Sequence, residues 1–330
     1  MAPGTAAGAG MPPWRCRQVP GAAASATIDG AGRAPKPALV SLRTRPPPPP
    51  LSLAMNHAAS SRLAAGTVLA PLRVAAKLAA WVLISVPLLP LQWLLMRFTR
   101  GRGAFVLPRL WFACLRTLMG IRVERVGVPR RGGGTLFVGN HISHFDIVVL
   151  GSLLRARFIA KNDMERWPGM RHLGALAQTL FISRRRIDAA NVAAGVAAQI
   201  RPDHDVVLFA EGTTSSGEHV AAFKSSLFSL FLGGDTNARP WTLQPFTLEL
   251  LSVDGRPLAH GGERDAYAFY GAMQAGAHAM RFLGMSGAVL RVTFHAPIAI
   301  APGTQRKALA QQVHAVVAAV LAAPQGAGSA

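Results

Sequence analysis

The longest uncharged apolar stretch of the chain lies in its first third. Residues 78–96 read LAAWVLISVPLLPLQWLLM and contain no charged side chain. A stretch of this length reaches the threshold for a helix that spans a bilayer, although Pro87 and Pro90 should bend such a helix. Basic residues flank the stretch on both sides, so the distribution of positive charge indicates no orientation.

A second apolar stretch follows from Phe105 to Met119 and is interrupted by Arg109 and Arg116. The two stretches together predict an N-terminal, membrane-embedded helical pair over residues 67–120, bent and half-inserted rather than one clean span. A buried core helix is the alternative interpretation of the first stretch, because a long apolar helix can also lie inside a soluble protein.

From Ile121 onward, short apolar segments alternate with helical stretches. This alternation is typical of an α/β fold with a central, mostly parallel sheet flanked by helices. Helices are expected between the strands, for example at Asp188–Ile200, and a last one at Gln305–Ala322 carries apolar residues at helical spacing. The predicted strands are Ile121–Val128, Thr135–Gly139, Arg157–Lys161, Thr179–Ser183, Val206–Ala210, Trp241–Leu248 and Val289–His295.

Both ends of the chain have compositions that do not support a packed core. Residues 1–66 are rich in Pro, Ala and Arg and include the run Pro46–Pro50, which predicts a disordered leader. This leader is either genuine or an artefact of a start codon placed before Met55, and the residues favour neither. Residues 324–330 are predicted to form a disordered tail, which leaves residues 121–323 as the α/β domain.

The charge of the chain points to an anionic partner. The chain carries 35 Lys and Arg against 15 Asp and Glu, a formal net charge of +20, which attracts nucleic acid or an anionic lipid surface. Only 15% of the residues are charged while 50% are hydrophobic, and this combination favours lipid. The sequence contains no zinc finger, no RNA-binding signature and no Gly-Lys pair, so a nucleic-acid protein and a P-loop enzyme are disfavoured.

The sharpest chemical feature is the segment GNHISHFD at residues 139–146, which follows an apolar strand and precedes an apolar run. An imidazole is the usual general base near neutral pH, and a nearby carboxylate can orient it and stabilise its charged form. We expect His141 in the turn and Asp146 in the first helical turn to face one another. Two alternatives remain: Ser143 and Asp146 alone form a helix-capping pattern that needs no catalysis, and His144 is a second candidate base.

Together with three later motifs, this segment resembles the glycerolipid acyltransferase family, which includes the 1-acylglycerol-3-phosphate acyltransferases. The resemblance covers about Leu107 to Pro297, and the order and separation of the motifs fit. The four motifs are NHISHFD at 140–146, FISR at 181–184 with Lys161 upstream, FAEGT at 209–213 followed by Phe223-Lys224, and, loosely, QPF at 244–246.

The resemblance implies transfer of a fatty acyl group from acyl-CoA or acyl-carrier protein to the hydroxyl of 1-acylglycerol-3-phosphate, which gives phosphatidic acid without a cofactor. His141 would be the general base and Asp146 the carboxylate that orients it. Glu211 would bind acceptor hydroxyls or hold the arginine loop, and Lys224 would meet the donor's phosphates or lie on a helix surface. The residues expected to bind substrate are Arg184, Glu211, Gly212, Thr213, Lys224 and Lys161.

Thr214 departs from the family pattern, since many members have at this place an arginine thought to bind the acceptor's phosphate. The form EGTTS, followed by FKSS, is similar to the bacterial branch of lyso-ornithine lipid acyltransferases. Acylation of lyso-ornithine lipid or of another lysophospholipid is therefore the alternative activity. A non-catalytic basic membrane-surface protein is the alternative of another class.

The location expected from the basic flanks and the low cysteine content is a bacterial inner membrane, with the active site facing the cytoplasm. Cys16 and Cys114, the two cysteines of the chain, lie in segments of very different character. They predict no disulfide, which suits a reducing compartment. Membrane lipids, a lysolipid acceptor and the acyl donor are the expected partners, and nucleic acid is not.

Overall fold

The computed structural model describes residues 53–99, 101–161, 174, 177–182, 204–232, 241–258, 263–301 and 303–322. Most of the predicted leader, the predicted tail at 324–330, the helix predicted at Asp188–Ile200 and Arg184 all lie outside these residues. The backbone of Lys161 is described but its side chain is not. Expectations that concern these parts therefore stay predictions.

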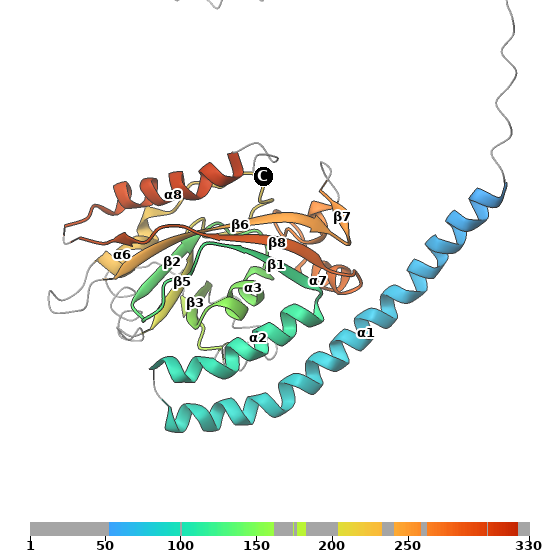
Figure 1. The fold of residues 1–330 in the computed structure, drawn as a ribbon, viewed down its shortest axis with the longest axis horizontal. Coiled ribbons are helices and arrows are strands. Elements are labelled where there is room, and N and C mark those ends of the chain that lie inside the picture. The colour runs from blue at the N-terminus through green and yellow to red at the C-terminus, as the bar shows by residue number, and fades with distance from the viewer. Residues whose placement is uncertain are drawn as a thin grey trace, which may run out of the picture. The chain divides into compact units, whose positions relative to one another are not determined.

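A twisted sheet forms the centre of the described part of the chain (Figure 1). The strand order is β1-β8-β6-β2-β5-β3-β4, and β7 and β9 pair with β6 beside this path. Along the path only the β6–β8 pair is antiparallel, so the mostly parallel sheet is confirmed. The strands are β1 (Ile121–Val126), β2 (Thr135–Gly139), β3 (Ala156–Lys161), β4 (Leu180–Ile182), β5 (Asp205–Phe209), β6 (Thr242–Val253), β7 (Arg256–Pro257), β8 (Ala288–Phe294) and β9 (Ile298–Ala299).

The predicted strands agree with the structure except at their ends, and β6 differs most. It continues past Leu248 to Val253 and pairs with β8 through an irregularity between Leu250 and Ser252. Glu249 and Ser252 interrupt the apolar pattern there, which made the strand look shorter. Both Leu250 and Val253 are buried, so the extension is part of the core.

Helices cover both faces of the sheet (Figure 1). Alternate side chains along β2 point to opposite faces, as the strand period of two requires. Phe137 packs in one core with residues of α2, α3 and α7, whereas Leu136 and Val138 pack in the other core with residues of α6 and α8. These helices are α2 (Val106–Leu118), α3 (Asp146–Leu153), α6 (Ser225–Leu232), α7 (Ala275–Leu283) and α8 (Arg306–Ala322).

The N-terminal apolar stretch forms one continuous helix, α1 (Leu53–Phe98), which includes Pro87 and Pro90 and is drawn as a curved ribbon in Figure 1. Its segment Ala70–Phe98 is long and apolar enough to cross a membrane, and only 6% of its most apolar window is buried inside the protein. That exposure contradicts the core-helix alternative. The second helix of the predicted pair, α2, has 13 residues, fewer than the roughly 20 that a span needs.

Helix α1 begins before the predicted boundary between leader and helices at residue 66. The stretch from Leu53 to Gly66 contains several alanines and leucines and no proline, so it can continue the helix that follows. The division of the chain at residue 66 between leader and membrane-associated helices stays a prediction.

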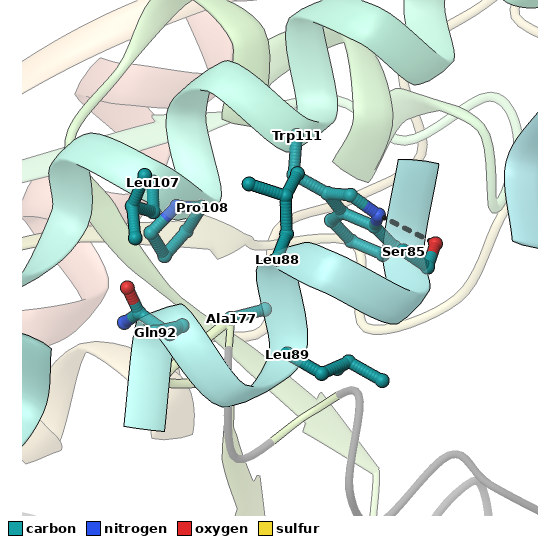
Figure 2. Close-up of a pocket in the computed structure, with 8 residues that line it drawn as sticks. All are labelled: Ser85, Leu88, Leu89, Gln92, Leu107, Pro108, Trp111 and Ala177. Carbon is teal, nitrogen blue, oxygen red and sulfur yellow. Dashed lines mark hydrogen bonds between the residues drawn. The ribbon is translucent and has the colours of Figure 1, made fainter. Parts of the chain in front are cut away.

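Polar side chains on α1 bind it to the rest of the described chain. Lys77 Nζ donates to the Met285 carbonyl at 2.8 Å, and Ser85 Oγ accepts the indole N–H of Trp111 at 2.9 Å. A small apolar cavity of about 30 Å³ lies between α1 and α2 (Figure 2). None of the four sequence motifs contributes to its lining, which consists of Ser85, Leu88, Leu89, Gln92, Leu107, Pro108, Trp111 and Ala177.

Candidate active site

His141 and Asp146 meet where β2 ends and the chain turns into α3. Their Nδ1 and Oδ2 atoms are 2.9 Å apart, the side chain of His141 is 15% exposed and that of Asp146 is fully buried. An ionised carboxylate only accepts hydrogen bonds, so Nδ1 carries the proton and Nε2 keeps a free lone pair. The predicted meeting of the two side chains is therefore present, and their catalytic role stays a prediction.

The carboxylate of Asp146 accepts four hydrogen bonds. Besides the imidazole, Oδ2 accepts the backbone N–H groups of Ile142 at 2.7 Å and Ser143 at 2.9 Å, and Oδ1 accepts the hydroxyl of Tyr267 at 3.0 Å. Asp146 also opens α3, where the helix dipole favours negative charge. These donors offset the cost of burying the charge and fix the carboxylate in one orientation.

The helix-capping alternative and the contact with His141 turn out to be compatible. Asp146 accepts the Ser143 N–H, which is one half of a capping box. The other half is altered, because Ser143 Oγ faces the Phe145 N–H at 3.4 Å instead of the N–H of Asp146. One carboxylate thus serves the turn and the imidazole together.

His144 lies in an aromatic environment away from the carboxylate. Its ring contacts those of Phe145, Phe269 and His278, and neither of its buried ring nitrogens has a hydrogen-bond partner in the described chain. Burial, with a smaller effect from His278, lowers the pKa of His144 to about 4. The geometry that suits a base therefore belongs to His141 and not to His144.

Neighbouring strands of the sheet hold His141 in place. Its ring stacks on Phe209 at the end of β5, with centroids 3.8 Å apart and planes at 11°. The preceding residue, Asn140, is fully buried and exchanges two hydrogen bonds with the backbone of Leu248 in β6, at 2.7 and 2.9 Å. Because β5 and β2 run parallel, their carboxyl ends bring the first and third motifs to one edge of the sheet, and Phe246 in β6 pairs with Gly139 at the end of β2.

Glu211 connects the third motif to the first through the backbone. Its Oε1 accepts the N–H of His141 at 2.9 Å and its Oε2 accepts the N–H of Ala221 at 3.2 Å. Burial raises the pKa of this carboxyl, and the two backbone donors oppose the rise. Glu211 therefore ties the segment 211–221 to the turn of His141. The arginine loop lies outside the described residues, so both predicted roles of Glu211 stay predictions.

Gly212 and Lys224 lie together beside this turn. Gly212 has a φ of +67°, and a Cβ atom there would lie 2.9 Å from the Cδ and Nζ atoms of Lys224. The Lys224 N–H donates to the Ala210 carbonyl at 2.8 Å, which places the lysine directly before α6. Thr213 and Lys224 are both exposed. Lys224 thus directly precedes α6 and lies next to the third motif, and both of its predicted roles stay predictions.

Tyr267 is the residue that the sequence interpretation missed. It follows a short 3-10 helix, η3 (Arg264–Ala266), and lies 121 positions from Asp146, outside all four motifs. Only its proximity to Asp146 in space identifies it. Among the described residues, no group of three or more His, Cys, Asp or Glu side chains is arranged to hold a metal ion.

Comparisons with known proteins agree with this architecture. A family model described as Acyltransferase matches residues 120–245. A lyso-ornithine lipid O-acyltransferase of Brucella abortus is 30% identical, over 76% of this chain and 94% of that protein. A 1-acyl-sn-glycerol-3-phosphate acyltransferase of Neisseria meningitidis is 28% identical, over 68% of this chain and 82% of that protein.

A solved structure shares the fold. The crystal structure of the 1-acyl-sn-glycerophosphate acyltransferase PlsC from Thermotoga maritima superposes with a TM-score of 0.54, and the match covers 79% of this chain and 96% of that one at 16% identity. The sheet, the ordered motifs and the near-complete match to the Brucella protein lead to one conclusion. The chain belongs to the acyltransferase family that includes bacterial lyso-ornithine lipid and 1-acylglycerol-3-phosphate acyltransferases, and it is an acyltransferase.

Proposed function

We propose that the protein transfers a fatty acyl group from acyl-CoA or acyl-carrier protein to the hydroxyl of a lyso-ornithine lipid. The observation that carries the chemistry is the His141–Asp146 contact, which leaves Nε2 of a partly exposed imidazole free to accept a proton. Since the chain is an acyltransferase, the alternative of a non-catalytic membrane-surface protein no longer applies.

In the proposed reaction, His141 Nε2 removes the proton of the acceptor hydroxyl while the oxygen attacks the thioester carbonyl. The new C–O bond forms as the C–S bond breaks, and the imidazolium returns its proton to the departing thiolate. Asp146 stabilises the imidazolium that exists between these steps, as the carboxylate of a Ser-His-Asp triad does. The acyl donor enters as a substrate, so the transfer needs no cofactor.

The proposed substrate-binding residues surround this pair. Lys224 would meet the donor's phosphates, since its exposed ammonium lies beside the third motif. Thr213 and Gly212 would contact the acceptor, because the missing side chain at Gly212 lets a substrate approach the backbone. Arg184 and Lys161 remain in this proposal on the family resemblance alone.

Two observations support a lyso-ornithine acceptor. The Brucella relative, which carries that name, is matched over 94% of its length. Thr214 offers a short neutral side chain where an arginine would bind a phosphate, and the head group of an ornithine lipid carries a carboxylate and an ammonium instead of a phosphate. Without the arginine, the site lacks a cation that would favour a phosphate dianion over such a head group.

The second candidate acceptor is 1-acylglycerol-3-phosphate, which would give phosphatidic acid. It is supported by the 28% identity to the Neisseria enzyme named for this substrate and by the same order of motifs. Acylation of another lysophospholipid belongs to the same class of reaction. The sequence interpretation preferred 1-acylglycerol-3-phosphate, because the commonest activity of the family uses it. The two observations above lead us to propose lyso-ornithine lipid as the first candidate instead.

The proposed location is a bacterial inner membrane with the active site on the cytoplasmic side, where acyl-CoA and acyl-carrier protein are available. The apolar helix α1 and the net charge of +20 support contact with an anionic membrane surface. Trp93 is among the exposed apolar side chains of this helix, and tryptophan suits the interface between lipid and water.

Membranes that contain the protein test this proposal. They should release free thiol from acyl-CoA or acyl-carrier protein only when lyso-ornithine lipid is added, and mass spectrometry should detect ornithine lipid. His141→Ala should lower the rate roughly 10²- to 10⁴-fold. Thiol release without acceptor would indicate a thioesterase, and faster turnover of 1-acylglycerol-3-phosphate would select the second candidate.

A further inference from the structure

Tyr267 is a fully buried tyrosine whose only described hydroxyl contact is the carboxylate of the catalytic pair. Its hydroxyl donates to Asp146 Oδ1 at 3.0 Å, while Oδ2 of the same carboxylate holds His141 at 2.9 Å. The tyrosine and the imidazole thus bind opposite oxygens of one carboxyl group. A residue placed in this way can influence the imidazole without touching a substrate.

The direction of this hydrogen bond is fixed by the chemistry of the two groups. Burial, and then the negative charge of Asp146, raise the pKa of Tyr267 well above its ordinary value, so the hydroxyl keeps its proton. The carboxylate can only accept, so the tyrosine donates at every pH at which the enzyme works. A donor to a buried charge is worth more than one to a neutral group.

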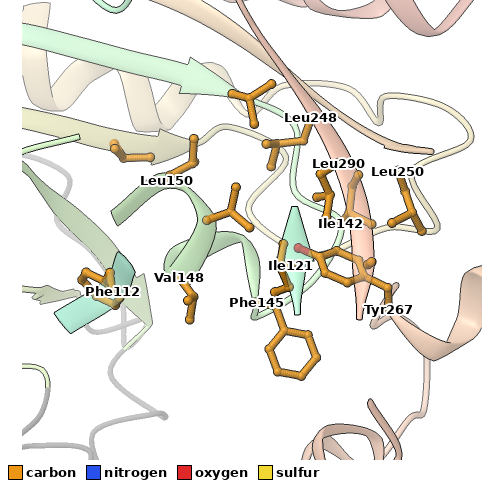
Figure 3. Packing of buried hydrophobic residues seen from close by; sticks show 14 of the residues in the cluster. Phe112, Ile121, Ile142, Phe145, Val148, Leu150, Leu248, Leu250, Tyr267 and Leu290 are labelled. Carbon is orange, nitrogen blue, oxygen red and sulfur yellow. The ribbon is translucent and has the colours of Figure 1, made fainter. Parts of the chain in front are cut away.

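The position of the hydroxyl is set by rigid surroundings. The ring of Tyr267 packs against those of Phe145 and Phe282, and Figure 3 shows it within the same buried cluster as Phe145 and Ile142. The following segment is tied to the catalytic turn, because the N–H of Phe269 donates to the Ile142 carbonyl at 2.9 Å. The loop therefore holds Tyr267 against the turn that carries His141.

We propose that Tyr267 is a positioning residue, which holds the Asp146 carboxylate in the orientation that binds Nδ1 of His141 and stabilises its ionised form. This inference rests on the proposed function, in which His141 is the base. Without the hydroxyl, Oδ1 would be buried without a donor and the negative charge would be concentrated on the side of His141. The protonated His141 ring would then be more stable relative to the neutral ring. The enzyme would therefore lose its base to protonation at a higher pH.

The chain supplies a matched control, because Tyr270 is its only other tyrosine. The Tyr270 hydroxyl donates to Asp265 Oδ1 at 2.6 Å and has no contact with Asp146. Tyr267→Phe and Tyr270→Phe each remove one oxygen from neighbouring positions. The other groups with an electrostatic influence on the pair, Glu211 and His144, stay unchanged in both variants.

The test measures kcat and KM for donor and acceptor across pH with membranes that contain each variant. We expect Tyr267→Phe to lower kcat roughly tenfold, which corresponds to loss of one hydrogen bond to a charged group. The acid limb of its pH profile should move to higher pH, with both KM values unchanged. Tyr270→Phe should behave as the wild type, and an unshifted profile for Tyr267→Phe would overturn the proposal.

Two further measurements separate this inference from a structural role and from the proposed reaction. In an Asp146→Asn background, adding Tyr267→Phe should change kcat much less than it does in the wild type; an equal loss would assign Tyr267 to packing alone. The NMR resonance of the His141 Nδ1 proton, identified by its absence in His141→Ala, should move in Tyr267→Phe, because the carboxylate that accepts this proton has lost its other side-chain donor. This change requires no turnover, so it would persist if every acceptor failed, whereas an unchanged resonance would refute the positioning role.

Discussion

The carboxylate of Glu211 binds the backbone N–H of His141 at 2.9 Å and not its ring. Its second oxygen holds the N–H of Ala221, so one buried side chain joins the end of β5, the turn after β2 and the loop that leads to α6. The Ser215 N–H returns to the His141 carbonyl at 2.9 Å, which closes the connection from the other side. The first and third motifs therefore form one hydrogen-bonded unit.

This unit predicts a graded response to changes at Glu211. Glu211→Gln keeps one oxygen acceptor, whereas Glu211→Ala leaves the N–H groups of His141 and Ala221 without their acceptor. The alanine variant should lose roughly 2 kcal/mol or more of unfolding free energy and most of its activity, and the glutamine variant should lose less of both. Denaturant titration of the detergent-solubilised protein measures the first effect. Equal losses in the two variants would show that the charge matters and the acceptor geometry does not.

A substitution at Gly212 tests two effects, backbone strain and contact with the Lys224 side chain, which a control substitution can separate. Gly212→Ala should cost about 1 kcal/mol because its φ is +67°, and the new Cβ should displace the Lys224 side chain, which lies 2.9 Å away. If Lys224 meets the donor, the KM for acyl-CoA should rise.

Gly255 is the control for this substitution. It has a similar φ of +76° and open space around the position of a Cβ atom, so Gly255→Ala carries the backbone cost without the contact. We expect it to lower stability by a similar amount and to leave the KM for acyl-CoA unchanged. A rise in KM for both variants would mean that lost stability, and not displacement of Lys224, causes the effect.

The sheet could be predicted from the sequence because its strands are marked by local pattern. After their first residues, Thr135 and Asp205, β2 and β5 are apolar, since both of their faces are buried, and short runs of this kind between turns indicate parallel strands. The contact between His141 and Asp146 was equally predictable, because the two residues are close in sequence and share one turn. Short sequence patterns were therefore enough to predict the sheet and the contact at the centre of the site.

Contacts between distant segments could not be predicted in this way. Tyr267 lies 121 positions from Asp146, and a tyrosine outside every motif carries no local signal. The choice between His141 and His144 also depended on packing, because both rings are near the same carboxylate in sequence. The contact of His141 with Asp146 and the aromatic surroundings of His144, provided by α7 and the segment before it, separate the two.

His144 predicts a specific loss of stability in mild acid. Its pKa is lowered by burial to about 4 in the folded protein, from the 6.5 of an exposed histidine. The unfolded chain therefore binds a proton at a higher pH than the folded one, so the contribution of His144 is full above about pH 6.5 and falls as the pH approaches 4. Between pH 7 and pH 5 this group alone should remove about 2 kcal/mol of unfolding free energy.

His144→Phe isolates this effect because the ring remains and the titration is lost. The variant should lose about 2 kcal/mol less than the wild type between pH 7 and pH 5, as measured by denaturant titration at both pH values. Buried carboxyls with a raised pKa, such as Glu211, act in the opposite direction, but they are the same in both proteins. His144→Phe should also keep most of its activity, and a loss as large as that of His141→Ala would restore His144 as the base.

Thr214 should determine which acceptor is preferred. This half-buried residue directly precedes Ser215, which is bound to the backbone of His141, so a side chain at position 214 lies near the catalytic turn. Thr214→Arg would place a guanidinium where a phosphate can form a paired hydrogen bond. The ratio of kcat/KM for 1-acylglycerol-3-phosphate to that for lyso-ornithine lipid should rise roughly tenfold, the equivalent of one charge-assisted hydrogen bond.

Thr214→Gln is the matched control for this change, because it adds length and hydrogen-bonding groups without charge. Both acceptors should be offered together in one vesicle preparation, so that the products report the ratio directly, at low and at high salt. Added salt should weaken the preference that Thr214→Arg creates, since screening reduces the attraction between exposed charges. A ratio that stays the same in Thr214→Arg, or that rises as much in Thr214→Gln, would remove position 214 from acceptor recognition and leave the head group to be selected elsewhere in the site.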